Sequence, residues 1–181
     1  RSEARSSRGV VASAHPLATE VGLDVLRRGG NVVDAAIAVS FMLGVAEPDA
    51  SGIGGDGMML VHLVDRGTTV AIDFKDQAPS RATRDNPALF DGNRSKTHGP
   101  AAVNIPGPVA GMDLAFRRYG SGRLSWADLV LPAARAAADG VEVTPGLASS
   151  VTRGKAYLEQ YPAAAQIYLP DGKPIQAGEI L

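Results

Sequence analysis

The residues best placed to do chemistry in this sequence are Asp73, Lys75 and Asp76. Apolar and polar residues alternate from Thr68 to Lys75, which predicts a β-strand with Asp73 and Lys75 on one face at its end. A lysine ammonium in that position can bind a substrate carboxylate as a compact point charge. The alternative is an ordinary surface ion pair on an edge strand, which contributes little to stability, and the residues alone favour this alternative.

A glycine-rich loop spans residues 51–57 (SGIGGDG). Loops that cradle phosphates run from a strand into a helix, so that amide groups at the helix N-terminus face the anion. Here a predicted helix precedes the loop, a predicted strand follows it, and no Gly-Lys-Ser/Thr is present. We therefore interpret the loop as a place where two backbones pass close together, which glycine permits, rather than as a nucleotide site.

Other catalytic and metal-binding chemistries have little support. The sequence contains no Cys, which excludes a thiol nucleophile, a thiolate metal site and a disulfide. The histidines His15, His62 and His98 are too far apart for a helical metal-binding pair, so we expect no metal site. Ser, His and Asp are all present, but no Gly-x-Ser-x-Gly motif marks a serine hydrolase.

Length and charge narrow the class of protein. The chain has 181 residues, enough for one domain with its own core, and we place no internal boundary within residues 1–181. Eighteen basic and 19 acidic residues give a net charge of −1, which argues against binding to nucleic acid or to an anionic membrane surface. The most apolar stretch, residues 32–45, is too short to span a bilayer, and residues 1–8 do not resemble a signal peptide.

The elements that must position Lys75 follow from periodicity and end signals. We expect a first helix to open at Pro16 and stop at Gly29, and a second, capped by Asn31, to end before Glu47. Residues 80–105 are expected to form a long polar excursion. Strands are expected at residues 58–64 and 68–75, and helices at 108–119 and 125–139. A further helix should begin at 144–145 and bury Leu147, Val151 and Leu158. A turn with a strand piece is expected at 168–181.

Several segments, taken in order, resemble the γ-glutamyltranspeptidase family. The most specific is residues 29–38 (GGNVVDAAIA), which is similar to the family's Gly-Gly-Asn-x-x-Asp-Ala-Ala block. The others are residues 9–18 (GVVASAHPLA, its opening strand and helix), 47–55 (its Gly-rich loop), 73–79 (DFKDQAP, its Asp-Phe-Arg-Glu-x-Ala-Pro) and 106–111 (PGPVAG, its Pro-Gly-x-x-x-Gly helix start). Together they cover most of the chain.

The resemblance implies an α+β fold, the αββα four-layer sandwich of N-terminal nucleophile hydrolases, with residues 1–181 forming the N-terminal part of the large subunit. Family members cut themselves from one precursor into a heterodimer, and the new N-terminal Thr of the small subunit attacks a γ-glutamyl amide, usually of glutathione. Water then gives hydrolysis, and an amine gives transpeptidation. The resemblance therefore implies no catalytic residue, metal or cofactor on this chain, which alone should be inactive.

One substrate-binding residue carries over from the resemblance. Lys75 occupies the position of the family's Arg, which clamps the α-carboxylate of the glutamyl group, and Asp73 and Asp76 are possible supports. Arg offers a planar two-pronged donor and Lys a single charge, so the glutamyl preference stays open. Asp56 stands where the family usually has Gly, and it either pairs with Lys75 or is simply solvated. Thr97-His98 does not match the family's self-cleavage pattern, Thr-Thr-His-x-Ser.

Two alternatives to a γ-glutamyl hydrolase and transpeptidase remain. One is a related acylase that acts on a non-glutamyl acyl amide, such as a glutaryl or oxamate amide or poly-γ-glutamate. The other is a non-catalytic descendant that keeps the scaffold for binding or assembly. The expected partners are the nucleophile-bearing small subunit, the rest of the large subunit and a small amide substrate, without nucleic acid. The resemblance suggests a periplasmic or secreted protein, and the other possibility is the cytoplasm.

Overall fold

The computed structural model describes residues 3–92 and 94–181, which divide into two compact units. The helical unit consists of the described residues up to Gly52 together with Tyr119–Leu181. The hairpin unit is Ile53–Arg118. Helices dominate the first unit. The regular part of the second consists of a two-stranded antiparallel sheet, a second and much shorter strand pair, and one helix.

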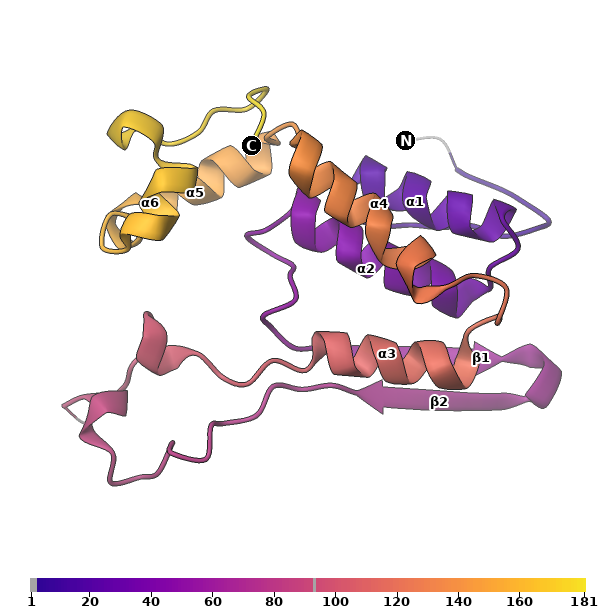
Figure 1. Ribbon diagram of the computed structural model, residues 1–181, viewed down its shortest axis with the longest axis horizontal. Helices are drawn as coiled ribbons and strands as arrows, with labels where there is room; N and C mark the ends of the chain where they lie inside the picture. The colour runs from indigo at the N-terminus through magenta and orange to yellow at the C-terminus, as the bar shows by residue number, and fades with distance from the viewer. Residues whose placement is uncertain (1–2, 93) are drawn as a thin grey trace. The chain divides into compact units, whose positions relative to one another are not determined.

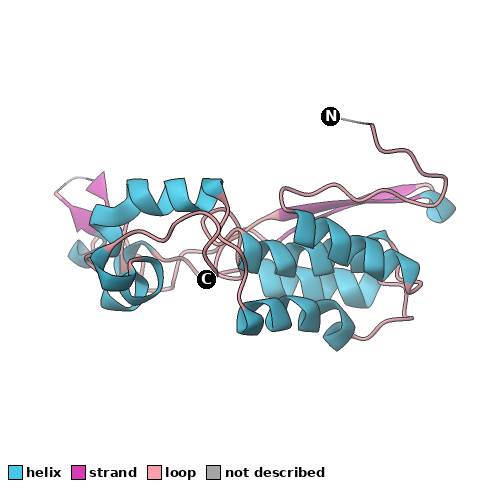
Figure 2. Cartoon of the chain, turned by 90° about the horizontal axis from the view of Figure 1, so that it is seen from above, coloured by secondary structure: helices cyan, strands magenta, loops and turns pink. Residues whose placement is uncertain are grey.

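Three helices pack side by side in the helical unit (Figures 1 and 2): α1 (Pro16–Arg27), α2 (Val32–Ala46) and α4 (Trp126–Asp139). The central helix, α2, contacts both of the others and is buried along most of its length, as its almost uniformly apolar sequence predicts. The largest side chains that are fully buried here include Ile37 of α2 and Leu129 of α4.

Local sequence signals set the starts of these helices. Asn31 Oδ1 accepts the N–H groups of Val33 and Asp34 at 2.9 and 3.0 Å, and Asp34 Oδ2 accepts the Asn31 N–H in return. Ser125 and Asp128 form the equivalent capping box at α4. Both helices therefore begin where their cap residues predict, since these side chains satisfy N–H groups that have no partner within the helix.

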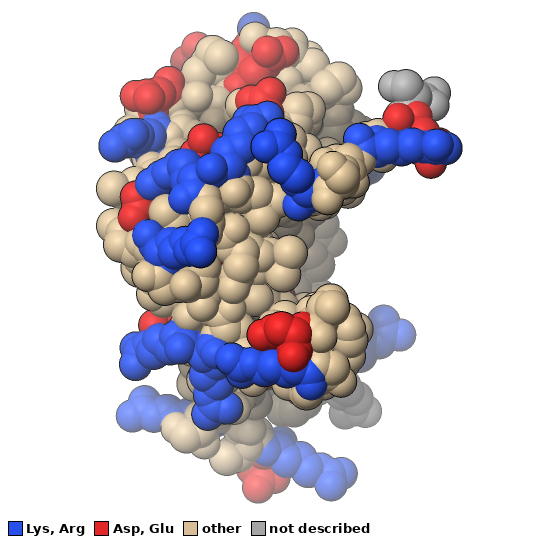
Figure 3. Space-filling view, turned by 90° about the vertical axis from the view of Figure 1, so that its right-hand side faces the viewer, with Lys and Arg blue, Asp and Glu red and all other residues tan. Residues whose placement is uncertain are grey.

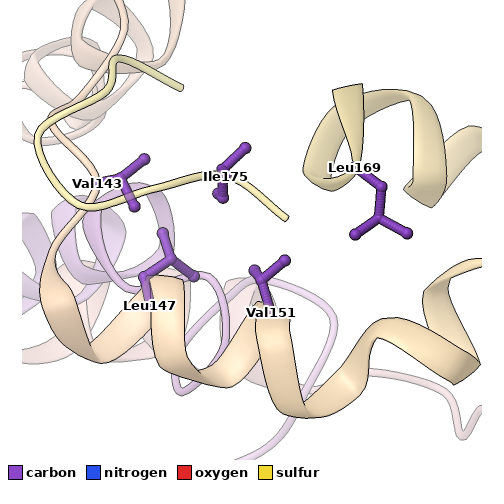
Figure 4. Close-up of a cluster of buried hydrophobic side chains, with 5 residues drawn as sticks. All are labelled: Val143, Leu147, Val151, Leu169 and Ile175. Carbon is purple, nitrogen blue, oxygen red and sulfur yellow. The ribbon is translucent and has the colours of Figure 1, made fainter. Parts of the chain in front are cut away.

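The C-terminal part of the helical unit has its own core. Helix α5 (Pro145–Leu158) begins at the predicted Thr144 cap and buries Leu147 and Val151. Helix α6 (Pro162–Tyr168) was not predicted, and a 3-10 turn, η4 (Pro170–Gly172), follows it. Figure 4 shows the side chains that meet between these elements, namely Val143, Leu147, Val151, Leu169 and Ile175.

The strand piece predicted in the C-terminal tail is a short antiparallel bridge between Glu142 and Ile180. Val141 and Leu181 exchange two backbone hydrogen bonds of 3.0 Å across it. The sequence indicated extended structure here but could not indicate its partner, because the two segments lie far apart in the chain. The bridge ties the end of the described chain to the segment between α4 and α5.

The sheet of the hairpin unit pairs β1 (Met58–Leu63) with β2 (Thr68–Asp73), and Met58 lies opposite Asp73. A 3-10 turn, η1 (Val64–Arg66), and Gly67, with φ of 56°, connect them. The prediction that β2 reaches Lys75 was wrong by two residues. Strand β1 begins at Met58, so within residues 3–92 and 94–181 no strand partners β2 beyond Asp73.

Helix α3 (Pro108–Tyr119) has the predicted bounds and lies alongside the hairpin (Figure 1), with all but its last residue in the hairpin unit. Val61 and Ile72 are the buried strand residues, and Met112 and Ala115 are buried on the helix. Strand residues on the other face, including Met58 and Leu60, are exposed. The hairpin therefore has one buried and one exposed face, as alternating strands do.

The predicted polar excursion at residues 80–105 is mostly irregular. It contains the short pair β3 (Phe90–Asp91) and β4 (Arg94–Ser95) and two 3-10 turns, η2 (Pro87–Leu89) and η3 (Pro100–Ala102). Residues 9–12 have no strand assignment, although the family resemblance implied one. A strand requires a neighbour, and within the described ranges no strand pairs with this segment.

Charge is mixed over the surface. On the face drawn in Figure 3, acidic side chains border the basic ones, and uncharged side chains separate the groups. Ion pairs four residues apart include Arg28 with Asp24 at 3.7 Å and Arg117 with Asp113 at 2.7 Å. Among the described residues, no helix is both long enough and apolar enough to cross a membrane.

Candidate functional site

Three segments of the hairpin unit meet where β2 ends. The N–H of Phe74 donates to the carbonyl of Gly57 at 3.1 Å, and the N–H of Gly107 donates to the carbonyl of Gly55 at 3.3 Å. Gln77 and Ile105 exchange two backbone hydrogen bonds of 3.0 and 2.8 Å. The glycine-rich loop, the segment after β2 and the segment before α3 are therefore held together by backbone contacts.

Phe74 packs against three glycines: Gly57 of the glycine-rich loop, Gly107 of the segment before α3, and Gly111 of α3. A Cβ atom on Gly57 would lie 2.6 Å from Phe74 Cε2. On Gly107 it would overlap the Phe74 carbonyl oxygen, and on Gly111 it would overlap the Phe74 side chain. At Gly57 the close neighbour is the Phe74 ring. The close backbone approach predicted for the glycine-rich loop is found at Gly52, whose Cα would lie 3.2 Å from a Cβ on Gly44 of α2.

Other glycines of that loop behave differently. A Cβ on Gly54 or Gly55 would meet nothing within 4 Å, so packing does not require glycine at these two positions, although the Gly55 carbonyl accepts the N–H of Gly107. The loop is thus packed at both ends, next to Gly44 and next to Phe74, and has open space for side chains in its middle. Asp56 lies between the open part and the packed part.

Lys75 extends from this fixed backbone into an exposed position. Its ammonium Nζ forms ion pairs with Asp56 Oδ2 and, at 3.3 Å, with Asp76 Oδ1. The Lys75 side chain is 68% exposed, whereas those of Asp56 and Asp76 are 34% and 22% exposed. Of the two alternatives for Asp56, the structure shows the ion pair.

The two predicted supports contact Lys75 in different ways. Asp73 Oδ1 accepts the backbone N–H of Lys75 at 2.9 Å and so fixes the main chain. Asp76 contacts the ammonium directly, and its other oxygen, Oδ2, accepts a 2.6 Å hydrogen bond from Asn104 Nδ2. The hydrogen bond from Asn104, followed by that from Lys75, lowers the pKa of Asp76 below its usual value.

Sequence reasoning missed Asn104. It lies 28 residues after Asp76, in the irregular segment that precedes α3. The only signal near it is the Pro-Gly motif that begins at Pro106. A contact over that separation depends on how the segments fold back, which periodicity does not indicate.

The cluster can bind and orient a charged group. An ammonium has three N–H donors, and two of those on Lys75 face carboxylates, which leaves the exposed side for a ligand oxygen. Held as an ion pair, the protonated amine has no lone pair, so Lys75 is not a nucleophile in this arrangement. The geometry therefore suits recognition of an anionic group.

The histidines are placed in separate parts of the chain. His15 Nδ1 accepts the N–H of Leu17 at the start of α1, and His62 Nδ1 lies 2.9 Å from Thr69 Oγ1 across the hairpin. His98 Nδ1 lies 2.8 Å from Thr97 Oγ1. Within the described part of the chain, no group of three or more potential metal ligands comes together.

Comparison with known proteins gives a clear sequence match. The family model described as gamma-glutamyltranspeptidase matches residues 18–181. The "glutathione hydrolase proenzyme" of Escherichia coli K12 is 40% identical over 181 residues, an alignment that covers 98% of this chain and 31% of the relative. The chain thus spans about a third of the length of the curated relatives it matches.

Solved structures agree with this match. The chain superposes on γ-glutamyltranspeptidase from Helicobacter pylori with a TM-score of 0.90 and 32% identity, covering 99% of this chain and 52% of that one. Cephalosporin acylase from Bacillus halodurans gives a TM-score of 0.84 and 30% identity, covering 99% and 35%. The expected fold is confirmed: an α+β chain that forms part of the αββα sandwich of N-terminal nucleophile hydrolases.

Proposed function

Because this chain belongs to the γ-glutamyltranspeptidase family, we propose that it forms the N-terminal part of the large subunit of a γ-glutamyl amide hydrolase and transpeptidase. The remainder of the large subunit and a small subunit with an N-terminal Thr complete the enzyme. Both subunits arise by self-cleavage of one precursor. A periplasmic or secreted location fits this family, and the cytoplasm is the alternative.

The reaction has two steps. The Thr hydroxyl attacks the γ-glutamyl carbonyl while the Thr α-amine takes its proton, the amide C–N bond breaks, and the leaving amine takes up a proton. The resulting ester, the acyl-enzyme, is then attacked by water or by an acceptor amine. Residues 1–181 supply neither nucleophile nor base in this scheme, so their task is to hold the donor.

Lys75 is the residue that we assign to this task. It binds the α-carboxylate of the donor through the exposed side of its ammonium, while Asp76, held by Asn104, orients the amine. Asp73 fixes the Lys75 backbone. The observation that carries the proposal is an exposed ammonium on a rigid backbone, at the position where the family's motif has its carboxylate-binding Arg.

The same observation favours one alternative. A lysine presents a single point charge, which any carboxylate can accept, whereas an arginine fork selects a bidentate geometry. A glutaryl, oxamate or poly-γ-glutamate donor would therefore also fit. Comparing γ-glutamyl-p-nitroanilide with glutaryl-p-nitroanilide on the complete enzyme separates these donor classes.

The test of Lys75 is a Lys75→Ala substitution in the complete, processed enzyme. A charge-assisted contact on an exposed side chain contributes roughly 1–2 kcal/mol, so KM for the γ-glutamyl donor should rise about fivefold to thirtyfold. The maximal rate should change less, because the carboxylate is bound equally in the ground and transition states. Lys155→Ala is the matched control, since Lys155 forms an exposed ion pair with Glu159 on α5. An unchanged KM in Lys75→Ala would refute the assignment.

Processing is tested separately. The denatured mass and N-terminal sequence of each polypeptide in the native preparation should reveal a second chain that begins with Thr. A preparation that contains a single uncleaved polypeptide would instead support the non-catalytic scaffold.

A further inference from the structure

We propose that Asp56 is a specificity-determining residue, whose carboxylate occupies the Lys75 ammonium in the free enzyme and competes with the carboxylate of the donor. The inference rests on the assignment of Lys75 as the carboxylate-binding residue. The proposed donor site then includes Asp56, a residue of the glycine-rich loop. Lys75 strengthens the binding of anionic donors, and Asp56 weakens it.

The two acids that contact Lys75 differ in how firmly they are held. Asp76 is the less exposed of the two, and its second oxygen is tied to Asn104 by a 2.6 Å hydrogen bond. The Asp56 carboxylate contacts the Lys75 ammonium through Oδ2. The backbone on either side of Asp56 is held by hydrogen bonds, at Gly55 to Gly107 and at Gly57 to Phe74, so a movement of Asp56 needs only a rotation of its side chain. Asp56 is therefore the carboxylate that can move away when a ligand arrives.

The charge at the site gives the sign of the effect. Lys75 contributes +1, and Asp56 and Asp76 contribute −1 each, so the three groups sum to −1 before any donor binds. An arriving carboxylate increases this negative charge unless an acid withdraws. Removing the charge of Asp56 lowers the repulsion between the site and the substrate carboxylate. It also frees one N–H of the Lys75 ammonium to bind that carboxylate.

The size of the effect follows from exposure. Lys75 is 68% and Asp56 34% exposed, and water and salt screen such pairs strongly. Losing the competing carboxylate should therefore tighten anionic donor binding by about twofold to fivefold. The change should shrink as ionic strength rises.

The experiment compares Asp56→Asn and Asp56→Gly with the parent protein in the complete, processed enzyme. Three donors are used: γ-glutamyl-p-nitroanilide, glutaryl-p-nitroanilide, and the γ-glutamyl compound with its α-carboxylate converted to a carboxamide. We expect KM for both carboxylate donors to fall about twofold to fivefold in each variant, with KM for the carboxamide unchanged. Asp65→Asn is the control, because Asp65 is a 78% exposed acid in the turn at the other end of the hairpin.

Several results would overturn the proposal. A rise in KM for both carboxylate donors would mean that Asp56 positions Lys75 instead of competing for it. A rise for the γ-glutamyl donor alone would mean that Asp56 binds the donor's ammonium group. An equal fall for the carboxamide would indicate a change in the loop that is unrelated to charge.

Calorimetric titration with glutarate gives the same comparison without turnover. Glutarate should bind Asp56→Asn about twofold to fivefold more tightly than the parent protein, and Lys75→Ala more weakly. If the parent enzyme hydrolysed none of the donors, the proposed function would fail. The glutarate titration would still decide the role of Asp56, and equal affinities in the parent and Asp56→Asn would refute it.

Discussion

Replacing Gly111 by alanine tests the packing that fixes the backbone of the proposed donor site. Gly111 is buried in α3, and a Cβ there would overlap the side chain of Phe74, the residue before Lys75. Gly154 in α5 provides a matched control, because a Cβ there would meet nothing within 4 Å. Both substitutions place alanine in the interior of a helix.

The two variants should differ in sign. Alanine is favoured over glycine inside a helix by roughly 1 kcal/mol, so Gly154→Ala should stabilise the protein by about 0.5–1 kcal/mol. At Gly111 the same gain is opposed by overpacking, which costs about 1–3 kcal/mol. Gly111→Ala should therefore lower the free energy of unfolding by about 0–2.5 kcal/mol and lie about 1–3 kcal/mol below the control.

Urea unfolding followed by circular dichroism measures both changes. A second background isolates the overlap: in Phe74→Ala, which removes the ring, Gly111→Ala should lose most of its unfavourable effect. KM for an anionic donor should rise in Gly111→Ala, because the displaced Phe74 carries Lys75 with it. If Gly111→Ala stabilised the protein as much as Gly154→Ala does, the described contact with Phe74 would be wrong.

Two further predictions concern the caps of the helical unit. Asp34 is fully buried and accepts backbone N–H groups from the start of α2 and from the loop after α3, so Asp34→Ala should reduce the free energy of unfolding by about 2–4 kcal/mol. Asp34→Asn, which retains an acceptor oxygen, should cost less in the same denaturant titration. Hydrogen bonds from Ser125, followed by that from Arg28, lower the pKa of Asp128 to about 2. Because this folded-state pKa lies below the ordinary value of 3.8, the stabilisation is present above about pH 4 and is lost as the pH falls towards 2. Unfolding measured from pH 5 to pH 2 should show this loss in the parent protein and a smaller one in Asp128→Asn.

The helices predicted from the sequence were those whose ends depend on neighbouring residues. Asn31 with Asp34 and Ser125 with Asp128 complete capping boxes within a single turn, so each signal can be read over four residues. Helix α6 carries Pro at its start but has no capping side chain and is short. Packing against α5 supports it, and that contact is not visible in a local pattern.

The residues of the proposed donor site were also predictable only in part, because some of their contacts join distant parts of the chain. Lys75 and its neighbouring acids lie within four residues, so their spacing indicated a charged cluster. Asp56, which pairs with Lys75, lies 19 positions before it, and Asn104, which bonds Asp76, lies 29 positions after Lys75. These contacts exist because the glycine-rich loop and the segment before α3 fold back onto the end of β2. From the sequence, an ion pair between Asp56 and Lys75 was one of two alternatives, the other being a solvated Asp56.

The enclosure of Phe74 by glycines has a consequence for how this site can change. Its backbone is anchored by contacts at Gly57, Gly107 and Gly111 that do not involve the Lys75 side chain. Substitutions at positions 56 and 75 can therefore alter the charge presented to a donor without rebuilding the main chain beneath it. Under the proposed function, donor preference is therefore open to protein engineering through two exposed side chains, whereas the glycines around Phe74 must be kept.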